Sequence, residues 1–542
     1  MRKIFCIIVI LIALFSNAQV PNWQWAKSHG STASENISGL AVNSIGESYT
    51  CGYYFSSNFT IGTYTLTNNG NYDSYVAKFD VNGNPLWVKS FGGGFDDNAN
   101  AIAIDAIGNS YVVGSFISAS MVCGTTTLTN SAFGDMFIVK MDVNGNILWA
   151  KNFGDGGSTV ANAVAVEASG NVLITGYYNS ATLTMGTFTL NTFGNNDAFV
   201  AKLDASGNVM WAQSFGDNLA ENANGITVDP SGNSYVTGLY KSSSLTVGTT
   251  TLNNTSPASA DIFLIKLNNM GNVLTATTFG DMLDEVATGI TRDINGNIIL
   301  TGYYFSPSLT IGTSTLSNYG SRDMLVIKTN SNCVSQWAQG GGGNNDDYGY
   351  GIGVDAVGRI YVNGHNHSFL ASFGTQTLSF GGVGDAFLVA YSPTGTALWA
   401  DGVGGGTDDG WNALALDGAG NIYCGGYFSS TSVSLGATNL NCNGSGDLLL
   451  AKMLNTTGLD VIAKNEDDFV MYPNPSSGIV NFRLLPEEGF DLEVYDAQGK
   501  SLFSLNHQPA SLALDFSNYP KGIYLVRMTK DELVLTKKLI IN

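Results

Sequence analysis

The stretch from Asp97 to Gly114, DNANAIAIDAIGNSYVVG, decides the fold of this chain. It contains two short apolar runs that are separated by a turn at Gly108-Asn109. Gly and Asn accept positive φ angles at low energetic cost, so such a pair between β-branched and aromatic runs is typical of a β-hairpin. A second hairpin follows at 135–149 and turns at Asn144-Gly145. We therefore expect a unit of four strands, which we name A to D in chain order.

This unit recurs along the chain with a period of about 62 residues. A Trp or Thr in strand D marks the copies, at Trp25, Trp87, Trp149, Trp211, Thr275, Trp337 and Trp399. A Gly marks the turn between strands A and B, at Gly46, Gly108, Gly170, Gly232, Gly296, Gly358 and Gly420. An Asp opens each strand C, at Asp73, Asp135, Asp197, Asp261, Asp323, Asp385 and Asp447. Regular copies of a four-stranded unit are typical of a β-propeller, in which each copy is one blade. The segment between strands B and C is expected to form a small extra ribbon.

The two ends of the repeat region complement each other. Residues 23–27 read as a strand D with no A, B or C before it, and the last copy ends with strand C at 447–452. We predict that the first strand completes the seventh blade and closes the ring. An open stack of sheets would instead leave two exposed edges that can aggregate. The predicted fold class is all-β, a seven-bladed β-propeller with four-stranded blades closed by the N-terminal strand.

The repeat unit at 97–114 resembles the bacterial seven-bladed beta-propeller (SBBP) repeat family. The resemblance extends over residues 20–455. It implies the propeller fold and says little about activity, because members of that family are mostly uncharacterised exported proteins.

The composition argues against several classes of protein. The chain has 542 residues, with 23 Lys and Arg against 43 Asp and Glu and a net charge of −20. Nucleic-acid binding needs cationic side chains for the phosphates, so no nucleic-acid partner is expected. With 44% hydrophobic and 11% aromatic residues, the chain can bury a core and is not disordered. Isolated thiols are expected, since the cysteines after residue 18 are scattered and odd in number.

The N-terminus has the layout of a secretory signal peptide. Arg2 and Lys3 precede an apolar run from Ile4 to Phe15, and small residues at 16–18 suit a cleavage site. We assign the signal peptide to residues 1–18, with a retained anchor as the alternative reading. No other apolar run approaches the length of a membrane span, so no transmembrane segment is expected after cleavage.

The 62-residue period of the repeat ends near residue 455. Residues 456–468 are Gly-containing and acidic and are interpreted as a linker. Alternating short strands follow over residues 469–542, which predicts a small Ig-like β-sandwich.

The same C-terminal residues resemble the type A sorting domain of the type IX secretion system. The matching blocks are Tyr472-Pro473-Asn474-Pro475 with Gly478, then Tyr495-Asp496 with Gly499-Lys500, and then Gly522 with Tyr524. The resemblance implies recognition by the type IX translocon and removal of the domain. It also implies that the protein passes through the periplasm of a Gram-negative bacterium and is then secreted or held at the cell surface.

One acidic position recurs at the entry to strand A. Glu35, Asp97, Thr159, Glu221, Glu285, Asp347 and Asp409 occupy it. If these side chains line the mouth of the central channel, they could bind calcium, because hard cations prefer oxygen ligands. The alternative is that each carboxylate caps nearby backbone. Runs such as Asp80 to Asn84 mimic the start of a calcium loop, but they lack the later Glu and are interpreted as tight turns. No other cofactor is indicated.

Copies six and seven depart most from the repeat. Trp411 stands where copies two to six have Ala or Gly, Tyr348 and Tyr350 flank that position in copy six, and His365 and His367 replace the usual Tyr and Phe after strand B. Aromatic rings beside Asp347 and Asp409 would suit capture of a glycan or a peptide ligand at the propeller mouth. The alternative for the two His is core packing, because two ligands alone make a poor metal site.

Three functions are compatible with these features. The first is a binding or adhesion module at the cell surface. The second is an enzyme acting on extracellular polysaccharide, in which the adjacent acids Asp346-Asp347 or Asp408-Asp409 would flank the scissile bond. The third is a structural surface component. We expect no enzyme activity, because no known catalytic motif is present.

Overall fold

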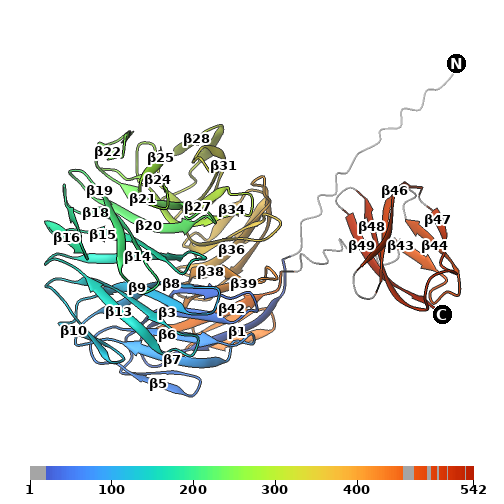
Figure 1. Cartoon of the computed structure of the whole chain (residues 1–542), viewed down its shortest axis with the longest axis horizontal. Coiled ribbons are helices and arrows are strands. Elements are labelled where there is room, and N and C mark those ends of the chain that lie inside the picture. The colour runs from blue at the N-terminus through green and yellow to red at the C-terminus, as the bar shows by residue number, and fades with distance from the viewer. Residues whose placement is uncertain (1–19, 456–468, 485–489, 497–499, 510, 531–532) are drawn as a thin grey trace. The chain divides into compact units, whose positions relative to one another are not determined.

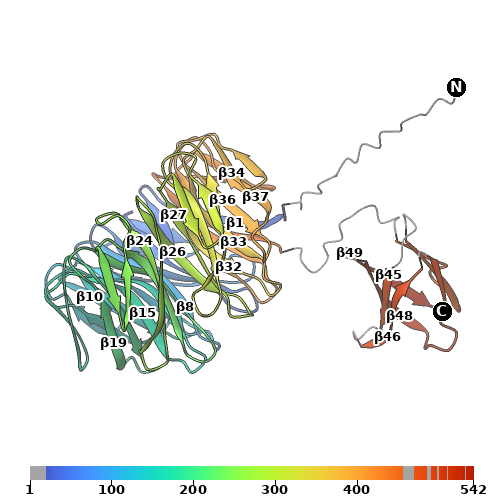
Figure 2. The ribbon, with the colours of Figure 1, turned by 90° about the horizontal axis from the view of Figure 1, so that it is seen from above.

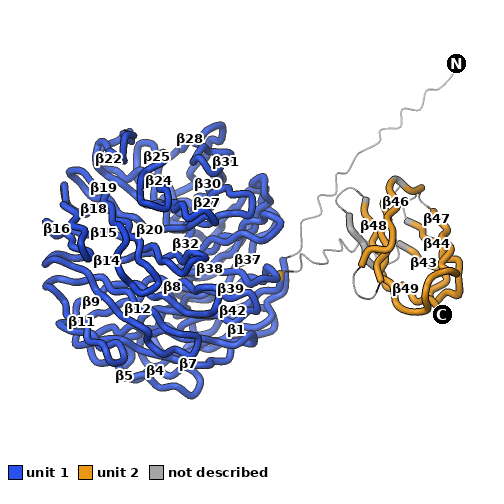
Figure 3. Tube along the Cα trace, in the orientation of Figure 1, with its two compact units in different colours: residues 1–454 blue, residues 455–542 orange. Residues whose placement is uncertain are grey.

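The computed structural model describes residues 20–455, 469–484, 490–496, 500–509, 511–530 and 533–542. The chain divides into two compact units, residues 1–454 and 455–542 (Figure 3). The predicted signal peptide and the predicted linker lie outside the described residues. Within the described ranges the regular structure is strand, and no helix there is long and apolar enough to span a bilayer.

The first unit consists of seven antiparallel sheets that follow the repeat. The A strands are β2 (Glu35–Val42), β8 (Asp97–Ile104), β14 (Thr159–Val166), β20 (Glu221–Val228), β26 (Glu285–Arg292), β32 (Asp347–Val354) and β38 (Asp409–Leu416). The B strands are β3 (Ser48–Tyr54), β9 (Ser110–Phe116), β15 (Val172–Tyr178), β21 (Ser234–Tyr240), β27 (Ile298–Tyr304), β33 (Ile360–Asn366) and β39 (Ile422–Phe428). The C strands are β6 (Asp73–Phe79), β12 (Asp135–Met141), β18 (Asp197–Leu203), β24 (Asp261–Leu267), β30 (Asp323–Thr329), β36 (Asp385–Tyr391) and β42 (Asp447–Met453). The D strands are β7 (Pro85–Phe91), β13 (Ile147–Phe153), β19 (Val209–Phe215), β25 (Val273–Phe279), β31 (Ser335–Gly342), β37 (Ala397–Val403) and β1 (Trp23–His29).

These sheets form a closed ring with the A strands at its centre. Each A strand contacts the A strands of both neighbouring blades, and β38 of the seventh blade contacts β2 of the first. Figure 1 shows β8, β14, β20 and β38 near the middle of this unit. Figure 2, turned by 90°, shows strands of neighbouring blades side by side. The predicted seven-bladed β-propeller is confirmed.

The N-terminal strand closes the ring as predicted. The seventh sheet has the order β1-β42-β39-β38, and β1 pairs antiparallel with β42, where Trp25 faces Lys452. The indole of Trp23 also donates a 2.7 Å hydrogen bond to Oδ2 of Asp401 in the sixth blade. The first strand is thus held by hydrogen bonds within the seventh blade and to the sixth and first blades.

A Trp in strand D ties most blades to the next one. The indole N–H donates to a backbone carbonyl in the C–D turn of the following blade: Trp25 to Val81, Trp87 to Val143, Trp149 to Ala205, Trp211 to Asn269 and Trp337 to Pro393. Gly145 in one of these turns has a φ of 77° and lies against the Trp87 ring, where a Cβ would come within 2.9 Å of ring atoms. Gly is therefore required there for both its backbone angle and its size.

The segment between strands B and C forms the expected ribbon in every blade. The ribbons are β4 (Asn58–Ile61) with β5 (Tyr64–Thr67), β10 (Ser120–Cys123) with β11 (Thr126–Thr129), β16 (Thr182–Met185) with β17 (Phe188–Asn191), β22 (Ser244–Val247) with β23 (Thr250–Asn253), β28 (Ser308–Ile311) with β29 (Ser314–Ser317), β34 (Leu370–Phe373) with β35 (Gln376–Ser379), and β40 (Ser432–Leu435) with β41 (Thr438–Asn441). They contact D strands and contribute buried side chains such as Phe59 to the cores between blades. The ribbon of the sixth blade also pairs with β31 through Gly341 and Gly342, which gives a six-stranded sheet.

The Asp-x-Asn-Gly-Asn runs form tight turns. Oδ1 of Asp80 accepts hydrogen bonds from the backbone N–H groups of Asn82 and Asn84, at 2.9 and 2.8 Å, and the Asn84 side chain donates to Oδ2. These contacts satisfy the carboxylate within the turn, which confirms the structural interpretation. The cysteines of the propeller, Cys51, Cys123, Cys333, Cys424 and Cys442, are free thiols.

The second unit consists of two sheets that enclose one core. Its strands are β43 (Phe469–Tyr472), β44 (Ile479–Leu484), β45 (Phe490–Tyr495), β46 (Ser501–Gln508), β47 (Ser511–Asp515), β48 (Gly522–Lys530) and β49 (Leu533–Ile541). One sheet has the order β43-β44-β47 and the other β46-β45-β48-β49. Phe482, Val494 and Val526 are buried in the shared core. This arrangement matches the predicted small sandwich.

Candidate functional site

The acidic residues at the entry to strand A are buried, which corrects the prediction of an open ring at the channel mouth. Glu35, Asp97, Glu221, Glu285, Asp347 and Asp409 have at most 1% of their surface exposed. In Asp97, Oδ2 accepts hydrogen bonds from the backbone of Gly93 and the hydroxyl of Ser118, both at 2.7 Å. The first residue of each A strand points into the blade, because strand side chains alternate between faces. These carboxylates cap local backbone, and no group of three metal-ligating side chains occurs among the described residues.

Most of these acids lie beside the Asp that opens strand C of the preceding blade. At the junction of the fifth and sixth blades, Asp323 Oδ1 and Asp347 Oδ2 both lie within 2.7 Å of the position that a Cβ on Gly342 would occupy. Burial and the charge of Asp347 raise the pKa of Asp323 to about 7. Burial and the charge of Asp97 likewise raise the pKa of Asp73 to about 6. The blade junctions therefore hold pairs of buried carboxyl groups, which we call the junction pairs.

Trp411 is also buried, so its predicted role as an exposed ligand anchor is wrong. Its side chain has 0% exposure and packs in the core of the seventh blade, with its ring centroid 5.9 Å from that of Trp23. The reason is again strand alternation, since Trp411 occupies the same inward position as the buried Ala99 and Ala223.

The other aromatic residues that differ from the repeat pattern lie together on the side of the propeller where the A strands begin. The group comprises Tyr303, Arg322, Asp346, Tyr348, Tyr350, His365, His367, Asp408 and Tyr427, and we call it the aromatic–acidic cluster. Each of its side chains is partly exposed. It joins three neighbouring blades, the fifth to the seventh. The four residues that the sequence singled out here, Tyr348, Tyr350, His365 and His367, therefore lie together.

A row of rings runs through the cluster. Tyr303 and Tyr348 meet edge to face at 5.0 Å between ring centroids, and Tyr348 stacks on Tyr350 at 5.9 Å. Tyr350 lies 4.9 Å from His365, which lies 5.5 Å from Tyr427. Such a row presents partly exposed ring faces over several blades.

A β-bulge positions Tyr350. Each A strand has an irregularity at its fourth residue, and in β32 this residue is Tyr350. In five of the other six blades the bulge residue ties two blades together by a side-chain hydrogen bond to the next blade: Asn100 to Ala161, Asn162 to Ala223, Asn224 to Ala287, Thr288 to Gly349 and Asn412 to Ile37. Tyr350 instead packs on its own blade, against Tyr348 and His365. Bulges often re-aim a side chain next to a functional site.

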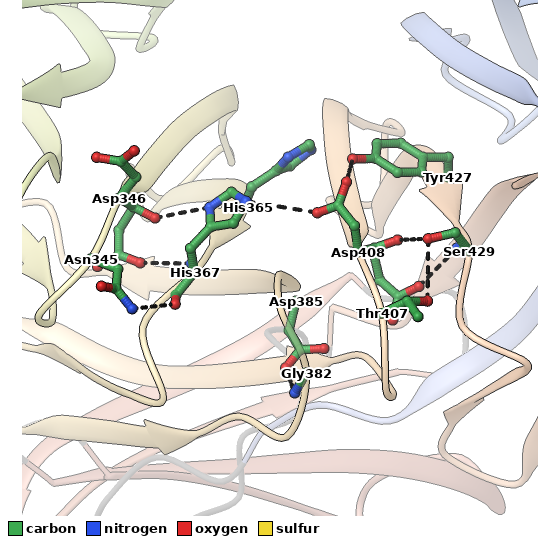
Figure 4. A network of polar contacts seen from close by, with 12 residues as sticks. Asn345, Asp346, His365, His367, Gly382, Asp385, Thr407, Asp408, Tyr427 and Ser429 are labelled. Atoms are coloured by element: carbon green, nitrogen blue, oxygen red, sulfur yellow. Dashed lines mark hydrogen bonds and ion pairs between the residues drawn. The ribbon is translucent and has the colours of Figure 1, made fainter.

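A polar chain connects the sixth and seventh blades (Figure 4). Nδ1 of His367 lies 3.0 Å from the backbone oxygen of Asp346, and Nε2 lies 3.7 Å from Oδ1 of Asp408. The hydroxyl of Tyr427 donates a 2.5 Å hydrogen bond to Oδ2 of Asp408. Burial, together with the hydrogen bond and charge of Asp408, raises the pKa of Tyr427, so its proton is retained.

His365 is held as a neutral ring. Its Nε2 lies 3.0 Å from Oδ1 of Asn412, whose Nδ2 donates to Asn36 and to the backbone of Ile37. Because the amide nitrogen of Asn412 is used by these two bonds, its oxygen faces His365 and Nε2 carries the hydrogen. Burial lowers the pKa of His365 to about 4. Gly410 makes room for the ring, since a Cβ there would lie 2.0 Å from Nε2 of His365.

Arg322 forms an ion pair and ring contacts within the cluster. Its Nη1 lies 3.3 Å from both carboxylate oxygens of Asp346 and 3.4 Å from the hydroxyl of Tyr348. Its guanidinium lies over the ring of Tyr303 at 5.8 Å. Burial alone would raise the pKa of Asp346, but hydrogen bonds and the charge of Arg322 outweigh it and lower that pKa. Asp346 is thus an ionised, paired carboxylate.

Sequence reasoning missed five members of the cluster as binding residues. These are Tyr303, Arg322, Asp346, Asp408 and Tyr427. Asp346 and Asp408 precede the predicted Asp347 and Asp409 by one residue, and that single step moves a side chain to the other face. A signal for Arg322 was present, because other copies have Tyr, Gly, Asn or Ala directly before the Asp of strand C.

The predicted sorting residues lie in the second unit. In the Tyr472-Pro473-Asn474-Pro475 block, Asn474 donates to the backbone oxygen of Lys538 at 2.7 Å and accepts from the backbone of Ile540 at 2.9 Å. The block is therefore fixed to the last strand, β49. Gly478, Tyr495, Asp496, Lys500, Gly522 and Tyr524 are also in the described part of this unit, whereas Gly499 lies outside it.

Two family models match parts of the chain. Residues 470–542 match the family described as "Secretion system C-terminal sorting domain". Residues 211–239 match the family described as "Beta-propeller repeat". A curated relative, the uncharacterized WD repeat-containing protein L264 of Acanthamoeba polyphaga mimivirus, is 27% identical over 418 residues. That match covers 62% of this chain and 30% of the relative, so the chain spans less than a third of that protein.

Several solved structures show distant likeness. Sqt1 from Chaetomium thermophilum is 7% identical with a TM-score of 0.28, and the match covers 64% of this chain and 97% of Sqt1. PorZ of Porphyromonas gingivalis, described as an essential bacterial surface component of the type-IX secretion system, is 10% identical with a TM-score of 0.15, over 95% of this chain and 100% of PorZ. A PL25 ulvan lyase is 12% identical with a TM-score of 0.37, over 74% of this chain and 93% of the lyase. At these TM-scores we transfer no functional property from them.

The repeat and tail matches agree with the fold described above. A sorting domain of this kind interacts with the type IX secretion machinery. The chain therefore combines a propeller, part of which matches the beta-propeller repeat family, with a C-terminal segment that matches a secretion system sorting domain, and this domain indicates export through the periplasm to the cell surface or the extracellular space.

Proposed function

We propose that the exported propeller is a glycan-binding module and that the aromatic–acidic cluster holds the ligand. One observation carries this proposal, namely the row of partly exposed rings that runs from Tyr303 through Tyr350 to Tyr427. Sugar rings have apolar faces that stack on aromatic side chains, while their hydroxyl groups need short polar partners. Asp346, Asp408 and the two His of the cluster supply such partners beside the rings.

The position of the row also supports binding. Its members come from consecutive blades, so the surface extends along a direction that a linear polymer could follow. The departures from the repeat are concentrated here, while the second to fifth blades and the seventh keep an Asn or Thr hydrogen bond at the bulge position. Tyr350 gives up this inter-blade hydrogen bond in the sixth blade, which supports a role for Tyr350 other than stability.

The test is retention of the purified chain on a polysaccharide panel, with Tyr348→Ala and Tyr350→Ala as variants. We expect retention by the unsubstituted chain and about tenfold weaker binding for either variant, a change of about 1.4 kcal/mol, because each substitution removes one stacking ring. Tyr177→Ala is the matched control, because Tyr177 occupies in the third blade the position of His365 and lies outside the cluster. Equal loss in the control would contradict a site at the cluster.

An enzyme acting on extracellular polysaccharide is the second candidate. His367 contacts the backbone oxygen of Asp346 and the carboxylate of Asp408, whereas the carboxylate of Asp346 is paired with Arg322, so only one of these two carboxylates lies beside His367. A glycosidase needs one acid with a raised pKa, and the paired Asp346 has a lowered one. This geometry favours binding over hydrolysis. Release of shorter saccharides from any panel member would establish the enzyme instead, and self-assembly without any bound glycan would favour a structural component.

A further inference from the structure

We propose that the glycan bound at the aromatic–acidic cluster carries free amino groups, and that an ammonium group is held between Asp408 and the neighbouring rings. This inference rests on the proposed function and adds the charge class of the ligand. It follows from the charges on this side of the propeller, from the surroundings of Asp408, and from a filled arrangement of the same kind beside it.

The loops around the cluster carry acidic charge. All ionisable residues in the loops between strands D and A are Asp: Asp96, Asp155, Asp217, Asp281, Asp284, Asp346 and Asp408. In the connections between strands B and C, outside the ribbons, the Lys and Arg residues are Lys241 and Arg322. Arg322 is paired with Asp346. A field of this sign attracts cationic ligands and repels uronate or sulfate groups.

Asp408 is the carboxylate that this inference uses. Its side chain is 45% exposed, but Oδ1, which lies 3.7 Å from Nε2 of His367, is itself buried and accepts no hydrogen bond from any of the described residues. Its other oxygen accepts the hydroxyl of Tyr427, which fixes the carboxylate beside a ring. His365 packs between Tyr427 and Tyr350 and is neutral, so it adds a ring without a competing positive charge. Cations are attracted to the faces of such rings and to a carboxylate at their edge.

The fifth and sixth blades show the same arrangement completed by a side chain. There Arg322 lies against Asp346 and over the ring of Tyr303. On the opposite ends of the blades, Lys78 similarly lies over Tyr49 and 2.9 Å from Glu47. In this fold a cation, a carboxylate and a Tyr ring thus recur as a unit. Asp408 with Tyr427 supplies the carboxylate and the ring of a further such unit, in which Oδ1 of Asp408 accepts no hydrogen bond from the described part of the chain.

The experiment is calorimetric titration of the purified chain with three hexasaccharides of the same linkage and length, made of glucosamine, N-acetylglucosamine or glucose. N-acetylation removes the positive charge of the amine but also adds an acetyl group, so the glucose hexamer serves as a second uncharged comparison that lacks this group. We expect the glucosamine hexamer to bind about tenfold or more tightly than the other two, and increasing salt to weaken that preference. Asp408→Asn should remove the preference, with an unchanged melting temperature showing that the variant is folded.

Asp217→Asn is the matched control, because it removes one negative charge from the same side of the propeller but from a loop between the third and fourth blades. It should change glucosamine binding by no more than about twofold. Equal binding of the three hexamers would overturn this inference and leave the glycan-binding proposal standing. An unaltered preference in Asp408→Asn would also overturn it. Binding of oligolysine without binding of any hexamer would contradict both proposals.

Discussion

The indole of Trp23 donates a hydrogen bond to Oδ2 of Asp401, so the first strand of the propeller is linked to a blade that lies 378 residues further along the chain. Trp23 also packs against the buried Trp411. We expect Trp23→Ala to lower the free energy of unfolding by about 3 kcal/mol, since it removes a large packed ring and one hydrogen bond. Denaturant unfolding monitored by Trp fluorescence measures this change.

The conservative variant Asp401→Asn is the control for that experiment. The Asn side chain keeps an oxygen that can accept the hydrogen bond from the Trp23 indole. The substitution also removes a carboxylate whose charged form is disfavoured by burial, as the raised pKa of Asp401 indicates. We expect its unfolding midpoint to stay close to that of the unsubstituted chain. A Trp23→Ala variant as stable as the unsubstituted chain would show that closure of the ring does not depend on this contact.

The junction pairs predict that the propeller gains stability as the pH falls from 8 to 5. The pKa of Asp323 is raised to about 7 and that of Asp73 to about 6, so both are higher in the folded chain than the ordinary value of 3.8. Such groups contribute stability that is fully present below about pH 4 and is lost as the pH rises through 6 to 7. His29 and His365 act in the opposite direction below pH 6.5, because burial lowers the pKa of each to about 4.

Asn substitutions isolate the contribution of the carboxyl groups from that of the His residues. We expect Asp323→Asn to raise the free energy of unfolding at pH 8 by about 2 kcal/mol and to have little effect at pH 5, where Asp323 is already protonated. The control is Asp135→Asn. Asp135 opens strand C of the second blade, and the residue that begins the next A strand is Thr159 instead of an Asp or Glu, so no junction pair forms there. Asp135 accepts hydrogen bonds from Ser131 and Asn152, so this variant should be destabilised. Melting curves across this pH range would contradict the prediction if Asp323→Asn were destabilising at pH 8.

Gly410 predicts a way to disturb the cluster without changing any polar group. A Cβ at this position would lie 2.0 Å from Nε2 of His365, so Gly410→Ala must displace that ring from Asn412 and Tyr427. We expect at least tenfold weaker glycan binding and a modest loss of stability. Val160→Ala, at the equivalent position of the third blade, should leave binding unchanged. NMR of the His365 side chain would report whether the ring has moved.

Asn474 predicts a link between the fold of the tail and export. Its side chain makes two hydrogen bonds to β49, and Asn474→Ala would remove both, at a cost of about 1–3 kcal/mol to the second unit. We expect less of the chain outside the cell and more in the periplasm, measured by fractionation and immunoblotting. Removal of residues 470–542 should abolish export. Normal export of that truncated chain would show that the matched sorting domain is dispensable.

The repeat made the architecture predictable, because the phase of its first and last copies is visible in the residues. The Trp at 25 without a preceding blade and the strand C at 447 without a following D determined how the ring closes. The hairpin turns were equally predictable, since Asn and Gly at fixed positions specify positive φ angles locally. The turns depend on neighbouring residues within one blade, and the closure of the ring depends on which strands the first and last copies contain.

The site was predictable only in part, because its contacts cross between blades. His365 meets Tyr427 and Tyr303 meets Tyr348 across blade boundaries, and no pattern within one copy shows which positions face one another. Asp347 and Asp409 were chosen over Asp346 and Asp408 because the first inward residue of strand A is not marked in the sequence. A shift of one residue in the start of a strand exchanges buried and exposed side chains.

Ring closure by the first strand determines how the propeller would respond to mechanical load. The backbone of Leu454 donates to that of Asn22 beside the Trp23–Met453 pair, so the chain enters and leaves the propeller at the same end of the β1–β42 ladder. A pulling force applied between these two points acts across the ladder and opens its hydrogen bonds one after another. The side chains of Trp23 and Trp25 also link β1 to the sixth and first blades, so these two blades share the load until β1 has separated. The closing strand is thus also the first mechanical release point of the ring.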